Sequence, residues 1–213
     1  MKKPLLLIFL VLIIDQVIKI YVKTHFIVGE EYKIAPWFIV IFQENNGIAF
    51  SMFSGNGSKI FLSLFRIAAV IGIGWYLKFL INTKAHQGLI LSIALIFAGA
   101  LGNIIDSAFY GMIFSDDYFN VATMFPKDGG YAGFLHGKVV DMFFFPLVRG
   151  HFPSWVPFWG SQDFIFFREI FNFSDSAISV GILLIIFFQR KFYPRKPEAT
   201  VSSKEVSETI QGA

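Results

Sequence analysis

The stretch PLLLIFLVLIIDQVIKIYV, residues 4–22, decides the fold class of this chain. A bilayer core of about 30 Å requires roughly 20 mostly apolar residues in a helix, and this stretch has that length. Lys2 and Lys3 precede it, as they would in a secretory signal, but Asp15 and Lys19 inside it are unusual for a cleaved signal. The stretch therefore predicts a transmembrane helix that remains part of the protein.

Three further apolar segments, at about 60–81, 88–109 and 172–189, have the length of a membrane span. The composition agrees, because 55% of the residues are hydrophobic and only 15% are charged. The region 110–171 has no charge-free run of span length, and prolines at 146, 153 and 157 interrupt its apolar stretches, so no fifth span is expected there. We expect an all-α membrane protein with four transmembrane helices.

Basic residues predict the orientation of these helices. They flank the start of the first span, the turn after the second and the end of the fourth: Lys2, Lys3, Lys78, Lys84, Arg190, Lys191, Arg195 and Lys196. The positive-inside rule then places both termini in the cytoplasm and the loops at about 23–59 and 110–171 outside.

The first outer loop contains two β-prone runs, WFIVIFQE (37–44) and NNGIAFSMF (45–53). They predict a small β-rich outer subdomain. We expect residues 1–193 to form one membrane domain and 194–213 to be a disordered cytoplasmic tail.

Polar side chains gather near the outer ends of the predicted helices. Since charges inside a membrane are costly and tend to be functional, they predict one polar site at the outer leaflet. Each also has a simpler explanation: Asn172 or Asp175 could cap a helix, and Asp15 with Lys19 could form an i,i+4 ion pair. The set consists of Asp15, Lys19, Asn103, Asp106, Asn172 and Asp175, with Asp141 following GKVV in the outer region.

Two neighbouring carboxylates cannot both ionise cheaply, so one stays protonated while the other acts as a base. This chemistry needs no metal and no cofactor.

Cysteine is absent from the sequence, which excludes thiol chemistry, and the four histidines form no HExxH motif. A serine mechanism using Ser174 or Ser176 has no base placed beside it by the sequence. The net charge of +3 is spread too widely to indicate a nucleic-acid partner. The main alternative function is a transporter or proton-coupled channel, although the cytoplasmic halves of the spans lack acidic residues.

Five motifs occur in a fixed order: DQVIK (15–19), NNGIAF (45–50), GALGNIID (99–106), GKVVD (137–141) and FNFSDSAISVG (171–181). In these motifs the chain resembles the lipoprotein signal peptidases, also called signal peptidase II. The resemblance implies an aspartic endopeptidase of the bacterial inner membrane that cuts diacylglyceryl-modified prolipoproteins just before the lipid-modified cysteine.

The resemblance also implies roles for individual residues. Asp141 and Asp175 match the catalytic pair. The positions expected to bind substrate or support the site are Asp15, Lys19, Asn45, Gly47, Asn103, Asp106 and Asn172. The implied partners are prolipoproteins, membrane lipids and cyclic peptide inhibitors of the globomycin type. We expect a monomer.

The chain departs from the family pattern at two positions and in length. Ser107 stands where the family usually has Arg, and Ser174 where it usually has Ala. Arg66, Arg149 or Arg168 could supply the missing positive charge. Aromatic-rich outer insertions are expected at about 112–133 and 146–168, either as a lid or as a platform that rests on the membrane.

Overall fold

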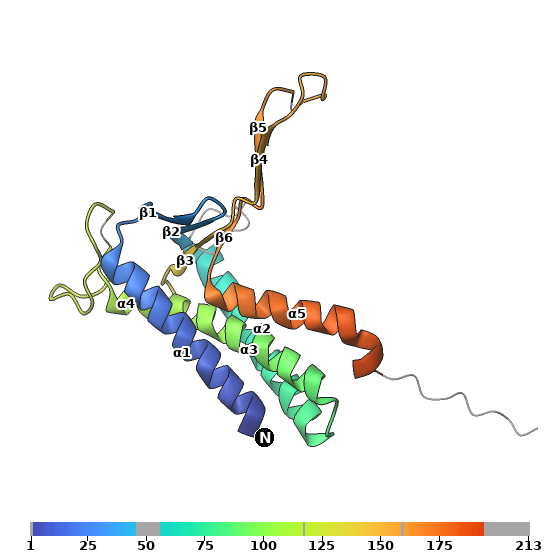
Figure 1. Ribbon diagram of the computed structural model, residues 1–213. Helices are drawn as coiled ribbons and strands as arrows, with labels where there is room; N and C mark the ends of the chain where they lie inside the picture. The colour runs from blue at the N-terminus through green and yellow to red at the C-terminus, as the bar shows by residue number, and fades with distance from the viewer. Residues whose placement is uncertain (1, 46–55, 117, 159, 194–213) are drawn as a thin grey trace, which may run out of the picture.

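Four long helices form the body of the protein in a computed structural model (Figure 1). The structure describes residues 2–45, 56–116, 118–158 and 160–193. The helices are α1 (Lys2–His25), α2 (Asn56–Asn82), α3 (Gln87–Ile105) and α5 (Phe173–Phe192). Each has the length and apolar composition to cross a membrane. The four predicted spans are therefore confirmed as helices, with ends that differ by a few residues.

The third span ends in an unusual way. After α3 the chain continues as a π-helical turn, η1 (Asp106–Tyr110), and a short α4 (Gly111–Ile113). The wider π turn leaves backbone carbonyls without their usual helical partners. Those of Ser107 and Ala108 accept hydrogen bonds from the N–H groups of Gly137 and Leu135, at 2.8 and 3.3 Å. The GKVVD segment is thereby attached to the C-terminal end of α3.

Gly137 allows this close approach. A Cβ atom at this position would lie 2.2 Å from the backbone oxygen of Asp106, which no side chain tolerates. The glycine of GKVVD is therefore required by packing against η1.

A four-stranded antiparallel sheet lies at one end of the bundle (Figure 1). Its order is β1 (Glu31–Ala35), β2 (Phe38–Asn45), β3 (Val139–Phe144) and β6 (Ile170–Phe171). The small β-rich subdomain is thus confirmed, and it draws strands from both outer loops. Most of the predicted run 45–53 lies outside the described residues, as does the predicted tail 194–213.

The second insertion forms a hairpin of β4 (Val148–His151) and β5 (Asp163–Phe166). It projects away from the bundle, and its tip lies far from β3 (Figure 1). Trp155 and Phe158 near the tip are 79% and 92% exposed. A lid formed by this hairpin is therefore not supported in this arrangement. The first insertion is mostly irregular, with an isolated pairing of Phe114 and Met124.

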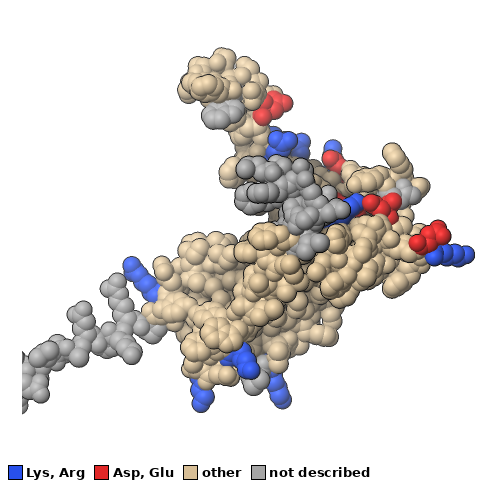
Figure 2. Space-filling model, turned by 180° about the vertical axis from the view of Figure 1, so that it is seen from behind, with Lys and Arg blue, Asp and Glu red and all other residues tan. Residues whose placement is uncertain are grey.

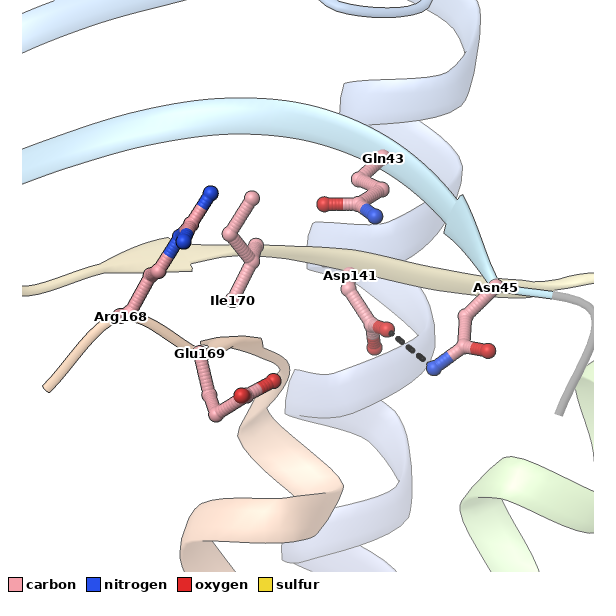
Figure 3. Close-up of a pocket in the computed structure, with 6 residues that line it drawn as sticks. All are labelled: Gln43, Asn45, Asp141, Arg168, Glu169 and Ile170. Carbon is pink, nitrogen blue, oxygen red and sulfur yellow. Dashed lines mark hydrogen bonds between the residues drawn. The ribbon is translucent and has the colours of Figure 1, made fainter. Parts of the chain in front are cut away.

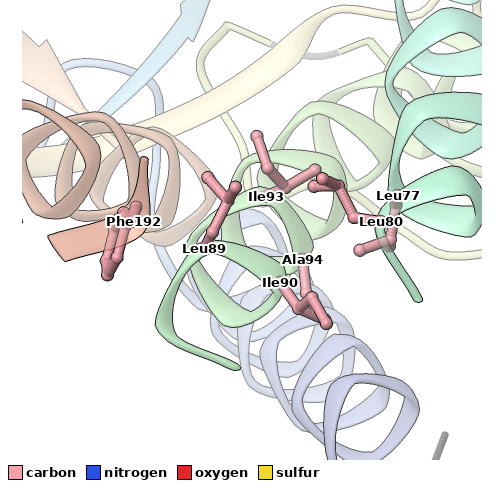
Figure 4. Packing of buried hydrophobic residues seen from close by; sticks show 7 residues of the cluster. All are labelled: Leu77, Leu80, Leu89, Ile90, Ile93, Ala94 and Phe192. Carbon is pink, nitrogen blue, oxygen red and sulfur yellow. The ribbon is translucent and has the colours of Figure 1, made fainter. Parts of the chain in front are cut away.

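Apolar side chains hold the other end of the bundle together. Leu77 and Leu80 of α2 pack against Leu89, Ile90, Ile93 and Ala94 of α3, and Phe192 of α5 completes the cluster (Figure 4). On the face shown in Figure 2, acidic side chains gather at the sheet end, whereas the opposite end carries only Lys and Arg.

Helices α3 and α5 approach each other through small residues. A Cβ at Gly99 would lie 2.2 Å from the backbone oxygen of Ser174, and one at Gly181 would lie 2.6 Å from that of Ser92. Small residues are the usual means by which membrane helices come into backbone contact. This contact fixes the start of α5 against α3.

Candidate active site

Asp141 lies in β3, an inner strand of the four-stranded sheet. Strand β3 pairs it with Gln43 of β2, and the residue is only 3% exposed. Both carboxylate oxygens accept hydrogen bonds from amide side chains: Oδ2 from Asn45 Nδ2 at 3.1 Å and Oδ1 from Asn172 Nδ2 at 2.7 Å. A rigid strand and two amide donors therefore fix the position of this carboxyl group.

Asp175 lies in the first turn of α5. Its backbone N–H donates to Asn172 Oδ1 at 3.0 Å, and its Oδ2 accepts from the backbone N–H of Asn172 at 3.2 Å. This reciprocal capping box confirms the helix-cap interpretation of the two residues. The other oxygen, Oδ1, accepts from Asn103 Nδ2 at 2.8 Å. A helix N-terminus stabilises negative charge, so the location suits a carboxylate.

Asn172 links the two aspartates. Its Nδ2 donates to Asp141 while its Oδ1 caps the helix at Asp175. Burial and the nearby charge of Asp175 raise the pKa of Asp141 from its usual value to about 7, despite the hydrogen bonds from Asn45 and Asn172 that lower it. We call the carboxyl groups of Asp141 and Asp175 the dyad. Their environments differ, as is required when one carboxyl group acts as a general acid and the other as a general base.

A buried ammonium group lies beneath the dyad. Lys19 Nζ is 3.0 Å from Asp15 Oδ2 and 2.8 Å from Asp106 Oδ2, and the three side chains are fully buried. It also donates to Asn103 Oδ1 at 2.9 Å. The predicted i,i+4 ion pair of Asp15 and Lys19 is thus confirmed, and it belongs to a larger network that reaches the dyad through Asn103.

The two acids of this network each hold the backbone next to an aspartate of the dyad. Asp15 Oδ1 accepts from the N–H of Ser174, the residue before Asp175, at 2.9 Å. Asp106 Oδ2 accepts from the N–H of Val140, the residue before Asp141, at 3.3 Å. The predicted convergence of polar residues from separate helices is confirmed by these contacts. Gly47, the remaining predicted site residue, lies outside the described residues.

Sequence reasoning missed Gln16. Its Nε2 donates to Asp106 Oδ1 at 2.9 Å and to Asp15 Oδ2 at 3.1 Å, and its Oε1 accepts from Tyr110 at 3.1 Å. An amide inside the apolar stretch 4–22 was a signal that could have identified it.

A second buried ion network, also missed, lies under the sheet. Glu44 of β2 pairs with Lys23 of α1 and with Lys138 at 2.8 Å, and Lys138 also pairs with Asp116 of the first insertion at 2.8 Å. Burial lowers the pKa of Lys138, but hydrogen bonds to Asp116 and Glu44 outweigh it and raise that pKa above its usual value. Glu44 and Lys138 flank residues of the site, so this network braces β2 against β3.

A polar cavity of about 370 Å³ opens beside Asp141. Its lining comes from β2, β3 and the segment that enters β6: Gln43, Asn45, Asp141, Arg168, Glu169 and Ile170. Figure 3 shows these six side chains and the hydrogen bond from Asn45 to Asp141. An extended peptide could therefore reach the Asp141 carboxyl group through this cavity. Arg168 and Glu169 show that the base of the second insertion contributes to it.

The two departures from the expected motif are both buried. Ser107 Oγ donates to the backbone oxygen of Asn103 at 3.1 Å, as a serine inside a helix often does. Ser174 Oγ finds no hydrogen-bond partner among the described residues. A Cβ at Gly102 would lie 2.2 Å from this hydroxyl, which shows how tightly it is enclosed.

Fold and site together define a multi-pass membrane protein that holds two aspartates in a polar cluster at one end of a four-helix bundle. Comparison with known proteins identifies the family. Residues 7–190 match the family described as signal peptidase (SPase) II, and the chain therefore belongs to it. These peptidases remove signal peptides from prolipoproteins. The alternative of a transporter or channel is not supported.

Similar proteins cover nearly the whole chain. A lipoprotein signal peptidase from Porphyromonas gingivalis is 48% identical over 200 residues, which cover 93% of this chain and 86% of the relative. One from Amoebophilus asiaticus is 32% identical, covering 94% and 84%. A solved structure described as a bacterial membrane enzyme matches with a TM-score of 0.60 and 25% identity, covering 91% of this chain and 96% of that one.

Proposed function

We propose that this chain is an aspartic endopeptidase that cleaves diacylglyceryl-modified prolipoproteins before the lipid-modified cysteine, with Asp141 and Asp175 as its catalytic residues. The observation that carries the proposal is the amide-bridged dyad: Asn172 donates to Asp141 and caps the helix at Asp175. Paired carboxylates in different environments are the arrangement that water activation requires.

The environments of the two aspartates suggest their roles. Asp141, with a pKa raised to about 7, serves as the acid. Asp175, at a helix N-terminus with an amide donor on one oxygen, serves as the base. Asp175 takes a proton from water, whose oxygen adds to the scissile carbonyl carbon. Asp141 donates its proton to the developing oxyanion, which gives a gem-diol. When the C–N bond breaks, Asp175 passes the proton it took from water to the amine of the new terminal cysteine, and Asp141 regains a proton from a gem-diol hydroxyl as the new carboxyl group forms.

The supporting residues position this pair. Asp15 and Asp106 hold the backbone before each aspartate, Lys19 neutralises both acids, and Asn103 joins Lys19 to Asp175. A geometric error of about 1 Å at reacting groups can cost a hundred-fold in rate, so such a frame has catalytic value.

The setting of the enzyme follows from charge and fold. Lys and Arg at the end opposite the sheet favour cytoplasmic termini and an active site at the outer leaflet of the inner membrane. The signal peptide and the lipid would then lie in the bilayer, and cyclic peptides of the globomycin type would occupy the cavity beside Asp141. We propose that the chain works as a monomer.

Separate Asp141→Asn and Asp175→Asn variants test the proposal. Each is expected to accumulate uncleaved diacylglyceryl-prolipoprotein in membranes at normal enzyme levels. Asp128→Asn, which changes an exposed aspartate of the first insertion, is the matched control and should process normally. Near wild-type cleavage by either dyad variant would refute the assignment.

A further inference from the structure

Arg66 occupies an inward position on a membrane-spanning helix. Residues 63, 66, 70, 73, 77 and 80 of α2 recur at spacings of three and four, so they share one face. Val70, Leu77 and Leu80 on this face are buried, and Leu77 and Leu80 pack against α3. Ser63, one turn before Arg66, donates to the backbone oxygen of Leu135 at 3.2 Å, in the segment that leads to β3. The stripe therefore directs Arg66 toward the polar end of the bundle.

The charge of Arg66 acts on the dyad. Its guanidinium is half-buried and interacts electrostatically with Asp175 first, then with Asp141 and Asp106. Lys19, the other cation near the dyad, is already paired with two carboxylates. Arg66 forms no ion pair and donates no hydrogen bond to the residues that the structure describes. Arg66 is therefore a cation near the dyad whose donors are not used by the described residues.

The other two arginines singled out in the sequence do not lie on a transmembrane helix. Arg149 is in β4 of the projecting hairpin, where it pairs with Ile165. Arg168 is exposed, lies in the segment before β6 and lines the cavity beside Asp141 (Figure 3). Arg66 is therefore the arginine that a transmembrane helix presents to the dyad, while position 107 carries a short buried serine.

We propose that Arg66 is a substrate-binding residue whose guanidinium donates to a carbonyl oxygen of the substrate beside the scissile bond. The inference rests on the proposed function, because it requires the dyad to be the reacting pair. A charged residue inside a membrane span is retained when it serves a site, and guanidinium carries five donors that match carbonyl and carboxylate oxygens. Two carbonyl sources lie next to the scissile bond: the peptide itself and the esters of the diacylglyceryl group.

The charged groups around the dyad determine what removal of Arg66 does to the pH profile. They come from α1, α2, η1 and the segment before β6: Asp15, Lys19, Arg66, Asp106, Arg168 and Glu169. A cation favours the ionised form of a nearby carboxyl group, so its loss makes the catalytic base harder to ionise. The acidic limb of the pH–rate profile should therefore move to higher pH.

The test compares Arg66→Gln, Arg66→Lys and the control Lys78→Gln in the full-length enzyme in detergent. Lys78 is an exposed cation of the same helix near its other end, so its loss tests charge alone. Two synthetic prolipoprotein peptides serve as probes, one with ester-linked and one with ether-linked lipid chains. For Arg66→Gln we expect kcat/KM on the ester probe to fall about ten- to hundred-fold, as for loss of a charge-assisted hydrogen bond.

The acidic limb should also move up by roughly half a pH unit in Arg66→Gln. Arg66→Lys should keep the wild-type acidic limb while losing part of kcat/KM, because it keeps the charge but not the planar fork of donors. Lys78→Gln should match wild type in both readouts.

The two probes identify the oxygen that Arg66 binds. An equal loss on both probes assigns it to the peptide carbonyl, and a loss confined to the ester probe assigns it to the lipid ester. Wild-type kcat/KM and an unmoved acidic limb for Arg66→Gln on both probes would overturn the proposal. The proposal would also be overturned if Arg66→Gln and Arg66→Lys lost the same amount of kcat/KM and neither variant moved the acidic limb. That result would indicate that Arg66 acts through packing alone. Failure of the proposed function itself is separate, because it appears as activity in Asp141→Asn or Asp175→Asn.

Discussion

A methyl group at position 99 has no room between α3 and α5. In Gly99→Ala the new Cβ would lie 2.2 Å from the backbone oxygen of Ser174 and 2.7 Å from Ile178 Cγ1. The first contact is with backbone, so no side-chain rotation relieves it. The start of α5, which carries Asp175, must move by about 1 Å to restore an ordinary contact. A displacement of this size at a reacting group costs on the order of a hundred-fold in rate.

The assay is kcat on a diacylglyceryl-modified prolipoprotein peptide, measured with purified enzyme. We expect kcat to fall about a hundred-fold in Gly99→Ala. Gly72→Ala is the matched control, because a Cβ at Gly72 of α2 meets nothing within 4 Å. It makes the same change in a membrane helix without crowding, and it should turn over at the wild-type rate.

The level and protease resistance of Gly99→Ala in membranes show whether the variant folds. A folded Gly99→Ala enzyme with wild-type kcat would refute the reasoning, because it would mean that the α3–α5 contact does not position Asp175. Equal losses in Gly99→Ala and Gly72→Ala would refute it as well, since they would point to glycine itself rather than to the contact.

Three further predictions follow from buried polar groups. Ser174→Ala should keep activity and raise thermal stability by up to about 1 kcal/mol, because it removes a buried hydroxyl without a partner among the described residues; a clear loss of stability would contradict this. Glu44→Gln should destabilise the fold by about 3 kcal/mol, since two buried lysines lose their shared carboxylate, whereas Lys33→Gln on β1 should have no effect in the same melting assay. Burial raises the pKa of Asp141 to about 7, so its contribution to stability is complete below the unfolded pKa of about 3.9 and is lost as pH rises from there to about 7. Asp141→Asn does not titrate, and its stability relative to wild type should therefore increase by ~1.4 kcal/mol per pH unit up to about pH 7, as melting at several pH values would show.

The motifs predicted much of the site. The residues of DQVIK, GALGNIID, GKVVD and FNFSD were expected at one level of the membrane, and the structure joins them by hydrogen bonds and ion pairs. The prediction succeeded because charged groups in apolar helices are few and conspicuous, and helix direction fixes their depth. Gln16 and Glu44 were overlooked because an uncharged amide in an apolar stretch is a weaker signal than a charge, and an acid in a loop is not unusual.

Hydropathy and spacing are local properties, and they indicated four spans, a β-rich end and a layer of polar residues. The resemblance of the motifs to the family then selected Asp141 and Asp175 from that layer. The tertiary structure alone decided which groups meet. Asp15 holds the backbone of Ser174 across a separation of 159 residues, Asp106 holds Val140, and α2 brings Arg66 near the dyad. The direction of the β4–β5 hairpin was likewise open, because aromatic composition fits both a lid and a projecting arm. These contacts join segments that are far apart in the sequence, so they depend on how the helices pack. The close approach of α3 and α5 is one such packing contact, and no single stretch of sequence determines it.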